Sequence, residues 1–198
     1  MSLIYIRELK KCIRNIIDTF KFRWRVFRNG GYAGSSIVVT HPEYIRIGKM
    51  VKIKKDYRIE CYPKFAGIKL QPEVIFGDRT IFGYNLTILG GAKVVIGADT
   101  IFAGNVTLIS ENHGIDPVSE VPYHAQPLIT GPITIGKGCW IGQNVSVLPN
   151  VKIGDKCIIA TNAVVSRDIP DYSIAAGIPA KVIKKYNFEE KRWEVLNN

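Results

Sequence analysis

The chain has 198 residues, 46% of them hydrophobic, which is enough for one domain with a continuous apolar core. No apolar stretch approaches the roughly 20 residues of a membrane-spanning helix, and the N-terminus lacks the apolar core of a signal peptide. The formal net charge is +10, and residues 1–55 hold all of this excess, with thirteen Lys and Arg against three acidic residues. The remainder of the chain is neutral, so the charge belongs to one segment rather than to the whole surface.

Residues 1–44 predict a basic amphipathic helix and a connector. Apolar residues recur at steps of three and four, which is the pattern of one helix face, and Asn29-Gly30-Gly31 marks the helix end. The face consists of Ile6, Leu9, Ile13, Ile16, Ile17, Phe20, Trp24 and Phe27. Eight Lys and Arg residues surround it, and such a helix suits a membrane surface that contains anionic lipid. The same face could instead cap the following domain or pack on a neighbouring subunit, and both interpretations stay open.

Residues 45–185 predict a parallel β-helix. From residue 135 to residue 170, six consecutive blocks of six residues each open with an aliphatic residue, at Ile135, Ile141, Val147, Ile153, Ile159 and Val165. Neither a helix nor a flat strand repeats in register every six residues, so each unit must be a short strand and a corner. Three units make one triangular turn, and successive turns stack as parallel strands about 4.8 Å apart. Residues 186–198 follow as a short tail.

The same six-residue step occurs upstream, with interruptions. It relates Ile47, Ile53 and Ile59, and it returns after an irregular stretch between residues 62 and 74. A second interruption is longer, because 27 residues separate Leu108 from Ile135 where six would continue the repeat. The excess predicts a loop over residues 110–132 that leaves the coil and contains His113 and His124. Long loops in compact domains are usually functional or disordered, and the prolines of this one favour function.

The chain resembles the hexapeptide-repeat acetyltransferases, which fold as left-handed parallel β-helices. The resemblance covers roughly residues 45–185 and includes maltose, galactoside, nodulation-factor and colanic-acid acetyltransferases and other polysaccharide O-acetyltransferases. Its motifs are "FGYNLTIL" with Asn85, "SENHG" with His113, "GCWIGQNV" with Trp140, and the closing "VVSRDIPDYSIAAGIPAKVIKK". Galactoside-type relatives have His-Pro where this chain has His113-Gly114, which leaves the histidine in place. The resemblance implies acetyl-CoA as acyl donor, no metal, and a homotrimer with active sites between subunits.

His113 is the predicted catalytic residue. A sugar hydroxyl is a poor nucleophile at neutral pH and must lose its proton as it attacks the thioester carbonyl. Neutral imidazole can take this proton, and in related enzymes the matching histidine is the base. Glu111 could accept a hydrogen bond from the second ring nitrogen, although a backbone carbonyl would serve as well. His124 is expected to be structural or to line the acceptor site.

The remaining site residues are implied by the resemblance. Asn85 matches an acceptor-binding residue, although asparagine at a repeat corner also satisfies the turn, and Tyr84 is a candidate for stacking on a sugar. Trp140 would form a wall of the groove for the pantetheine arm, and the backbone N–H near Gln143 would face the developing oxyanion. Acetyl-CoA is further expected to contact Thr161, Ser166, Arg167, Lys181 and Lys184.

The sequence therefore predicts a cytoplasmic acetyl-CoA-dependent O-acetyltransferase that acts on a sugar or glycan in surface polysaccharide synthesis. Acetylation of an amino sugar, or of serine, is the first alternative. A zinc-dependent carbonic anhydrase of the γ class is a remote one, because the chain has three histidines but no turn-to-turn spacing between them. The excess charge accompanies no nucleic-acid-binding motif, so no nucleic acid partner is expected.

Overall fold

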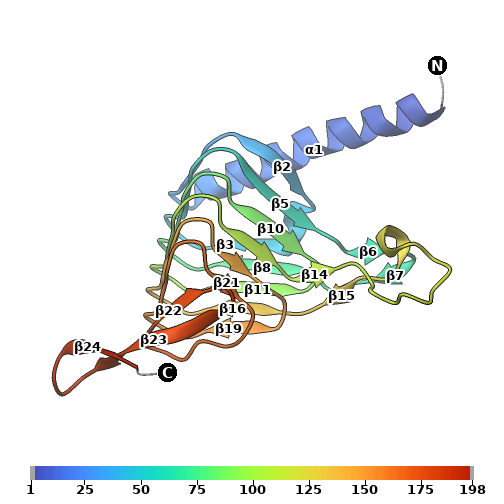
Figure 1. Cartoon of the computed structure of the whole chain (residues 1–198). Coiled ribbons are helices and arrows are strands. Elements are labelled where there is room, and N and C mark those ends of the chain that lie inside the picture. The colour runs from blue at the N-terminus through green and yellow to red at the C-terminus, as the bar shows by residue number, and fades with distance from the viewer. Residues whose placement is uncertain (1–2, 197–198) are drawn as a thin grey trace.

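The computed structural model describes residues 3–196, and the expectations for residues 1–2 and 197–198 lie outside this range. Three sheets form the walls of a triangular coil whose turns stack along one axis (Figure 1). Sheet A contains β1 (Tyr32–Ala33), β4 (Lys52–Ile53), β9 (Ile81–Phe82), β12 (Ile101–Phe102), β17 (Trp140–Ile141), β20 (Ile158–Ile159), β22 (Ser173–Gly177), β23 (Ala180–Asn187) and β24 (Arg192–Val195). Sheet B contains β2 (Ser36–Thr40), β5 (Tyr57–Cys61), β10 (Thr87–Gly90), β13 (Thr107–Ile109), β18 (Ser146–Val147) and β21 (Val164–Val165). Sheet C contains β3 (Ile45–Ile47), β8 (Glu73–Phe76), β11 (Lys93–Ile96), β16 (Ile133–Ile135) and β19 (Val151–Ile153).

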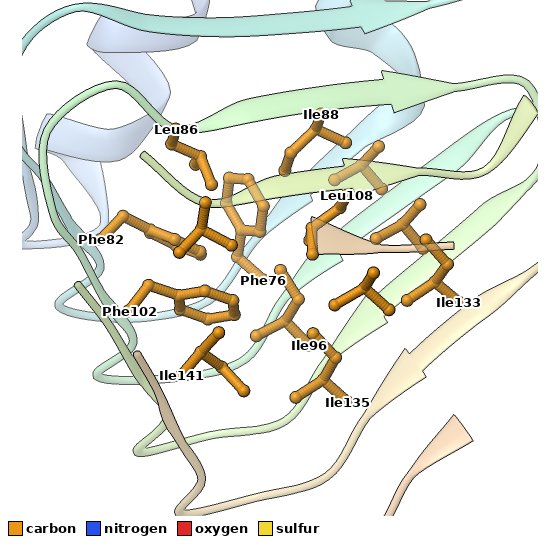
Figure 2. Close-up of a cluster of buried hydrophobic side chains, with 14 of the residues drawn as sticks. Phe76, Phe82, Leu86, Ile88, Ile96, Phe102, Leu108, Ile133, Ile135 and Ile141 are labelled. Atoms are coloured by element: carbon orange, nitrogen blue, oxygen red, sulfur yellow. The ribbon is translucent and has the colours of Figure 1, made fainter. Parts of the chain in front are cut away.

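The six-residue repeat gives the core its layers. Every block-opening residue from Ile135 to Val165 is buried, and so is every fifth residue of a block, from Cys139 to Ile169. Each strand is parallel to the strand one turn away, so side chains at equal repeat positions stack directly. Upstream, the rings of Phe82 and Phe102 stack in this way with a centroid separation of 4.7 Å, and the tilted ring of Phe76 packs against Phe82 at 4.8 Å (Figure 2). The predicted β-helix is confirmed.

The coil begins earlier than residue 45. Strand β1 pairs in parallel with β4, and β2 pairs in parallel with β5, so the segment expected to be a connector forms the first turn. The 3-10 helix η1 (Pro42–Tyr44) completes its corner. This turn shows little of the six-residue pattern because a helix, rather than another turn, covers one of its sides.

That helix is α1 (Leu3–Arg28), which lies across the end of the coil with its N-terminal half projecting beyond it (Figure 1). Phe22 and Val26 are fully buried against the first turn, and the ring of Phe22 lies 5.8 Å from that of Tyr57. The Arg25 guanidinium donates hydrogen bonds of 2.5 and 2.6 Å to the carbonyl oxygens of Pro42 and Ile45. The capping side chains are therefore different from those of the predicted apolar face, which remains largely exposed. Within residues 3–196, no helix has the length and hydropathy needed to cross a membrane.

The opposite end of the coil is closed by strands rather than followed by a tail. After β22, the chain turns at Ile178-Pro179 and returns as β23, antiparallel to β22, and β24 pairs with β23. Strand β23 runs past the expected boundary at residue 185, and the rings of Tyr186, Phe188 and Trp193 pack on one another there. This aromatic contact orders residues that the repeat pattern could not place.

Two insertions leave the coil on the same side (Figure 1). The first is a hairpin of β6 (Lys64–Phe65) and β7 (Ile68–Lys69), which accounts for the irregular stretch before residue 74. The second is the loop predicted over residues 110–132. Its root is an antiparallel pair of β14 (Glu111–Asn112) and β15 (Ile129–Thr130), and its outer part contains the 3-10 helix η2 (Tyr123–Ala125).

Candidate active site

His113 stands at the root of the second insertion. It follows β14 directly, and its side chain is exposed. The ring of Phe65, from the β6–β7 hairpin, lies 5.5 Å from the imidazole at an interplanar angle of 60°. The two insertions therefore meet at His113, and the hairpin supplies a wall against which the imidazole is held.

The turn after His113 depends on a glycine. A Cβ at Gly114 would lie 2.7 Å from the Cβ and Oε1 of Gln126, so this close approach excludes a side chain. Gln126 is 4% exposed, and its amide nitrogen donates to the carbonyl oxygens of Asp116 and Val121, both at 2.9 Å. Gln126 thus holds two parts of the loop together. The space that it occupies would be blocked by a side chain at position 114, which is consistent with glycine here in place of the proline of galactoside-type relatives.

Glu111, two residues before His113, is buried at the root of the second insertion. Glu111 is 9% exposed, and a Cβ added to Gly91 would lie 2.5 Å from the Cβ of Glu111. Burial raises the pKa of the Glu111 carboxyl, and the nearby charge of His113 opposes this shift. Among the described residues Glu111 makes no hydrogen bond to His113, so its predicted part in fixing the tautomer or binding substrate remains a prediction.

A ladder of asparagines runs along the corner between sheets A and B. Asn85, Asn105, Asn144 and Asn162 all have positive φ, and each amide nitrogen donates to the oxygen of the next at 2.8–2.9 Å. The turn-forming interpretation of Asn85 is therefore correct. Asn85 ends the ladder, and its Oδ1 accepts no hydrogen bond from any residue that the structure describes, so this oxygen is open to an acceptor hydroxyl. Tyr84, Gln143 and Thr161 precede ladder residues and share this exposed corner.

Sheet A carries an exposed apolar column next to this corner. Its outward side chains are Ile81, Ile101 and Trp140, which are 38%, 41% and 53% exposed. The register continues through Ile158 and Ile174 to Lys184, while Lys181 lies opposite Ala176 on the closing strands. An apolar column that ends at lysines fits an extended pantetheine arm followed by phosphates. The residues predicted to contact acetyl-CoA on this side are thus compatible with it.

The remaining predicted residues lie elsewhere. Ser166 and Arg167 follow β21, at the same end of sheet B from which the chain leaves for His113 after β13, two turns earlier. At about 3.3 Å per residue, the five residues from Asn105 to Ser110 span roughly 17 Å. One subunit therefore places Asn85, Tyr84 and the Trp140 column at one edge, and His113, Ser166 and Arg167 at another. No single hydroxyl could contact Asn85 and His113 of the same chain.

Three residues that shape the site were absent from the sequence prediction. Phe65 lies in the irregular stretch between residues 62 and 74, and Gln126 lies in a loop without a pattern. Gly91 follows Gly90 at a point where two extra residues interrupt the six-residue repeat. Only Gly91 carried a signal, since two glycines interrupting a strand repeat indicate a close approach of another segment.

The three histidines are not close enough together to form a metal site. His124 lies exposed in η2, and His41 precedes η1 with φ +52° and contacts Glu43 at 3.2 Å. Among residues 3–196, no three His, Cys, Asp or Glu side chains are grouped as metal ligands would be. The carbonic anhydrase alternative therefore lacks a ligand set within the described chain.

Residues 132–167 match the family model described as bacterial transferase hexapeptide, six repeats. A putative lipopolysaccharide biosynthesis O-acetyl transferase, WbbJ of Escherichia coli K12, is 38% identical over 167 residues, covering 79% of this chain and 83% of its own. The chain belongs to the hexapeptide-repeat acetyltransferase family. It is an acetyl-CoA-dependent acetyltransferase.

Solved structures of this family agree with the fold. A maltose O-acetyltransferase from Clostridium difficile 630 superposes with a TM-score of 0.59 at 29% identity, covering 72% of this chain and 71% of its own. A hexapeptide-repeat acetyltransferase from Vibrio cholerae, solved with acetyl-CoA, gives a TM-score of 0.52 at 25% identity, with coverages of 78% and 70%. The left-handed β-helix and the use of acetyl-CoA expected for this family member are confirmed.

Proposed function

We propose that this acetyltransferase esterifies a sugar hydroxyl during synthesis of a surface polysaccharide, with His113 as general base. The observation that carries the proposal is the position of His113, exposed at the meeting point of the two insertions and backed by Phe65. The similarity to a chain named for lipopolysaccharide O-acetylation supports the acceptor class.

The chemistry follows from a neutral imidazole at this place. One ring nitrogen of His113 accepts the acceptor's hydroxyl proton as the oxygen attacks the thioester carbonyl carbon. When the tetrahedral intermediate collapses, the C–S bond breaks, and the imidazolium returns the proton to the departing thiolate. The ester forms and the thioester is consumed, so no water or metal enters the balance.

We also propose a homotrimer in which each site is shared by two subunits. The separation of roughly 17 Å along sheet B supports this, because Asn85 and the Trp140 column of one subunit can face His113 only of another. A closed cyclic arrangement provides such a heterologous contact three times. Light scattering should give about three times 22.1 kDa, and a fully active monomer would contradict the proposal.

The base assignment is tested by two histidine variants. His113→Ala should lower kcat by about 10²–10⁴-fold with little change in acetyl-CoA binding, because only proton removal is lost. His124→Ala is the matched control, from the same insertion, and should cost less than about tenfold. Equal losses in the two variants would overturn the assignment. Treating the product with alkaline hydroxylamine distinguishes an ester, which is cleaved, from the amide that an amino sugar would give.

Shared sites are tested by mixing inactive subunits. His113→Ala and Asn85→Ala should each be nearly inactive alone. In randomly mixed trimers, about one quarter of the sites would combine an intact His113 with an intact Asn85 from the neighbour. Recovery of about one quarter of wild-type activity supports shared sites, and absence of recovery in mixed trimers of confirmed composition contradicts them.

The proposed location is the cytoplasm, at the membrane surface. All four cysteines are free, and Cys61, Cys139 and Cys157 are buried as thiols, which suits a reducing compartment. The basic segment within residues 1–28 is the candidate for peripheral contact with the membrane.

A further inference from the structure

We propose that one particular face of α1, opposite to the face that caps the coil, is a docking surface for a membrane containing anionic lipid. This outer face consists of Leu9, Ile13, Ile16, Ile17, Phe20, Trp24 and Phe27. The inference deepens the proposed location, and it rests on the proposed trimer only for the number of helices that reach one membrane.

The two faces of α1 are distinct. At about 100° per residue, Phe20 and Trp24 lie about 200° around the helix axis from Phe22, which is buried in the coil. Phe20 is 70% exposed and Trp24 is 52% exposed, whereas Phe22 is 0% exposed. Capping of the coil and binding of a membrane are therefore not alternatives, because they use opposite sides of the same helix.

The outer face is larger than the scattered apolar exposure of an ordinary surface. Its seven large side chains are each 47–70% exposed and follow one another along five turns. The apolar surface continues into a groove of about 920 Å³ between α1 and β1–β2, where Tyr32 and Ile37 are also exposed. The rings of Trp24 and Phe27 lie 6.0 Å apart, but within residues 3–196 no segment covers the outer face, because the coil packs on Phe22 and Val26 instead.

The charged side chains beside the outer face favour anionic lipid as its binding partner. Arg7, Lys10, Lys21 and Arg28 project on one flank of the outer face, and none forms an ion pair with a residue that the structure describes. Arg23 lies on the other flank. Asp18 turns toward the coil, is 6% exposed and pairs with Arg14 at 3.7 Å. An apolar stripe between basic flanks matches an anionic lipid surface, whose headgroups surround an apolar interior.

The orientation of the outer face is suitable for contact with a flat membrane surface. Because α1 lies across the end of the coil (Figure 1), a face about opposite to Phe22 and Val26 lies on the side of the helix away from the coil. One edge of this face also borders the groove beside β1–β2, which Phe20 and Trp24 help to line. In a cyclic trimer with the coil axes along the symmetry axis, three such faces would point the same way. Three linked weak contacts then give an avidity well above that of one helix.

Sedimentation of the full-length protein with vesicles tests the proposal. The vesicles contain phosphatidylcholine alone or with about one third phosphatidylserine. Wild type should bind only the anionic vesicles, and binding should weaken with added salt because the attraction is screened. Phe20→Ser/Trp24→Ser should weaken binding about 100-fold, since both rings lose their place in the lipid interface. The matched control Phe188→Ser/Val195→Ser changes side chains that are 61% and 65% exposed at the opposite end, and it should bind as wild type.

Charge is tested separately. Lys10→Gln/Lys21→Gln should weaken binding about 25-fold, at about fivefold for each lost charge near an anionic surface. Its control, Lys64→Gln/Lys69→Gln, removes two exposed lysines of the β6–β7 hairpin and should bind as wild type. Equal binding by both pairs would overturn the proposal, as would binding to neutral vesicles that salt does not weaken.

Two further readouts separate the possible failures. If Phe20→Ser/Trp24→Ser converts a larger assembly into trimers, a second copy covers the outer face and lipid docking is wrong. Acetyl transfer to a water-soluble acceptor should be unchanged in this variant, because the outer face does not contact the active site. If the wild-type protein fails to bind anionic vesicles but transfers acetyl groups, only the docking surface is refuted. If the wild-type protein binds them but transfers nothing, only the proposed reaction is refuted.

Discussion

The uninterrupted repeats and the two insertions follow different rules, although they adjoin at His113. Between residues 133 and 169, each position takes its burial from its place in a block of six, and neighbouring turns enforce the same register. In the insertions, position depends on single tertiary contacts, such as Phe65 against His113 or Gln126 against Gly114. The coil thus supplies a rigid scaffold whose stability is shared among turns, while His113, the proposed general base, lies on a segment that few contacts hold. Substitutions in the coil should therefore change stability, and substitutions in the insertions should change activity.

The largest effect is expected in the coil. Phe82→Ala removes the ring that contacts both Phe76 and Phe102 (Figure 2) and should lower the free energy of unfolding by about 3–5 kcal/mol. Ile115→Ala, at a position 74% exposed in the second insertion, is the control and should change it by less than about 0.5 kcal/mol. Denaturant unfolding at one fixed protein concentration measures both, because assembly contributes to stability. Similar losses would mean that the insertion is part of the cooperative core.

The next effect is on activity. Gly91→Ala places a Cβ 2.5 Å from the Cβ of Glu111 and should displace β14 together with His113. A misplacement of about 1 Å can cost about 10²-fold in rate, so we expect a loss of that order in kcat. Although Gly91 lies in the coil, the atoms nearest to the added Cβ belong to Glu111 and Thr130 of the second insertion, so the change in unfolding free energy should be small. Combining it with Glu111→Gly removes the opposing Cβ. The double variant should then be no less active than Glu111→Gly alone, and additive losses would exclude this contact as the cause.

The sequence predicted the coil well for a physical reason. A repeat of six is reinforced at every turn, so Ile135, Ile141 and their counterparts report the same structure many times. The location of His113 followed from the excess residues between Leu108 and Ile135. The contact between His113 and Phe65 could not be predicted, because Phe65 lies 48 positions away in the sequence. Phe65 belongs to a hairpin whose turn, Ala66-Gly67, has positive φ at both residues, and the sequence around it shows no strand pattern.

For the helix α1, the sequence predicted the apolar face but not the side chains that pack on the coil. Its strong periodicity selected Phe20, Trp24 and Phe27 as one face, which was correct as a pattern, but the coil packs on Phe22 and Val26 instead. A pattern reveals that a face is apolar without revealing its partner. The proposed division of the active site between subunits could not be predicted for the same reason, since a single sequence contains Asn85 and His113 without their relative positions in an assembly.

A smaller effect is expected at the contact between the insertions. Phe65→Leu keeps an apolar side chain but removes the aromatic pair with His113, worth about 0.5–1.5 kcal/mol beyond burial. We expect a decrease of kcat by about 2- to 13-fold without a change in the KM for acetyl-CoA. Ile68→Ala alters the cross-strand partner of Phe65 and serves as the control, with a smaller change. A higher KM with unchanged kcat would assign Phe65 to substrate binding instead of positioning.

The smallest effect concerns Glu111 and depends on pH. Because burial raises its pKa in the folded chain, the native state keeps this proton at pH values where the unfolded chain has lost it. The stabilising contribution is complete below the unfolded pKa, about 4.3, and is lost as the pH rises through the folded value. Glu111→Gln cannot lose a proton, so its stability relative to wild type should increase from pH 4 upward. Thermal unfolding at a series of pH values measures this difference. A difference that shrinks with rising pH would show that the charge of His113 outweighs burial, and Glu111 would then be the ionised partner of the catalytic base.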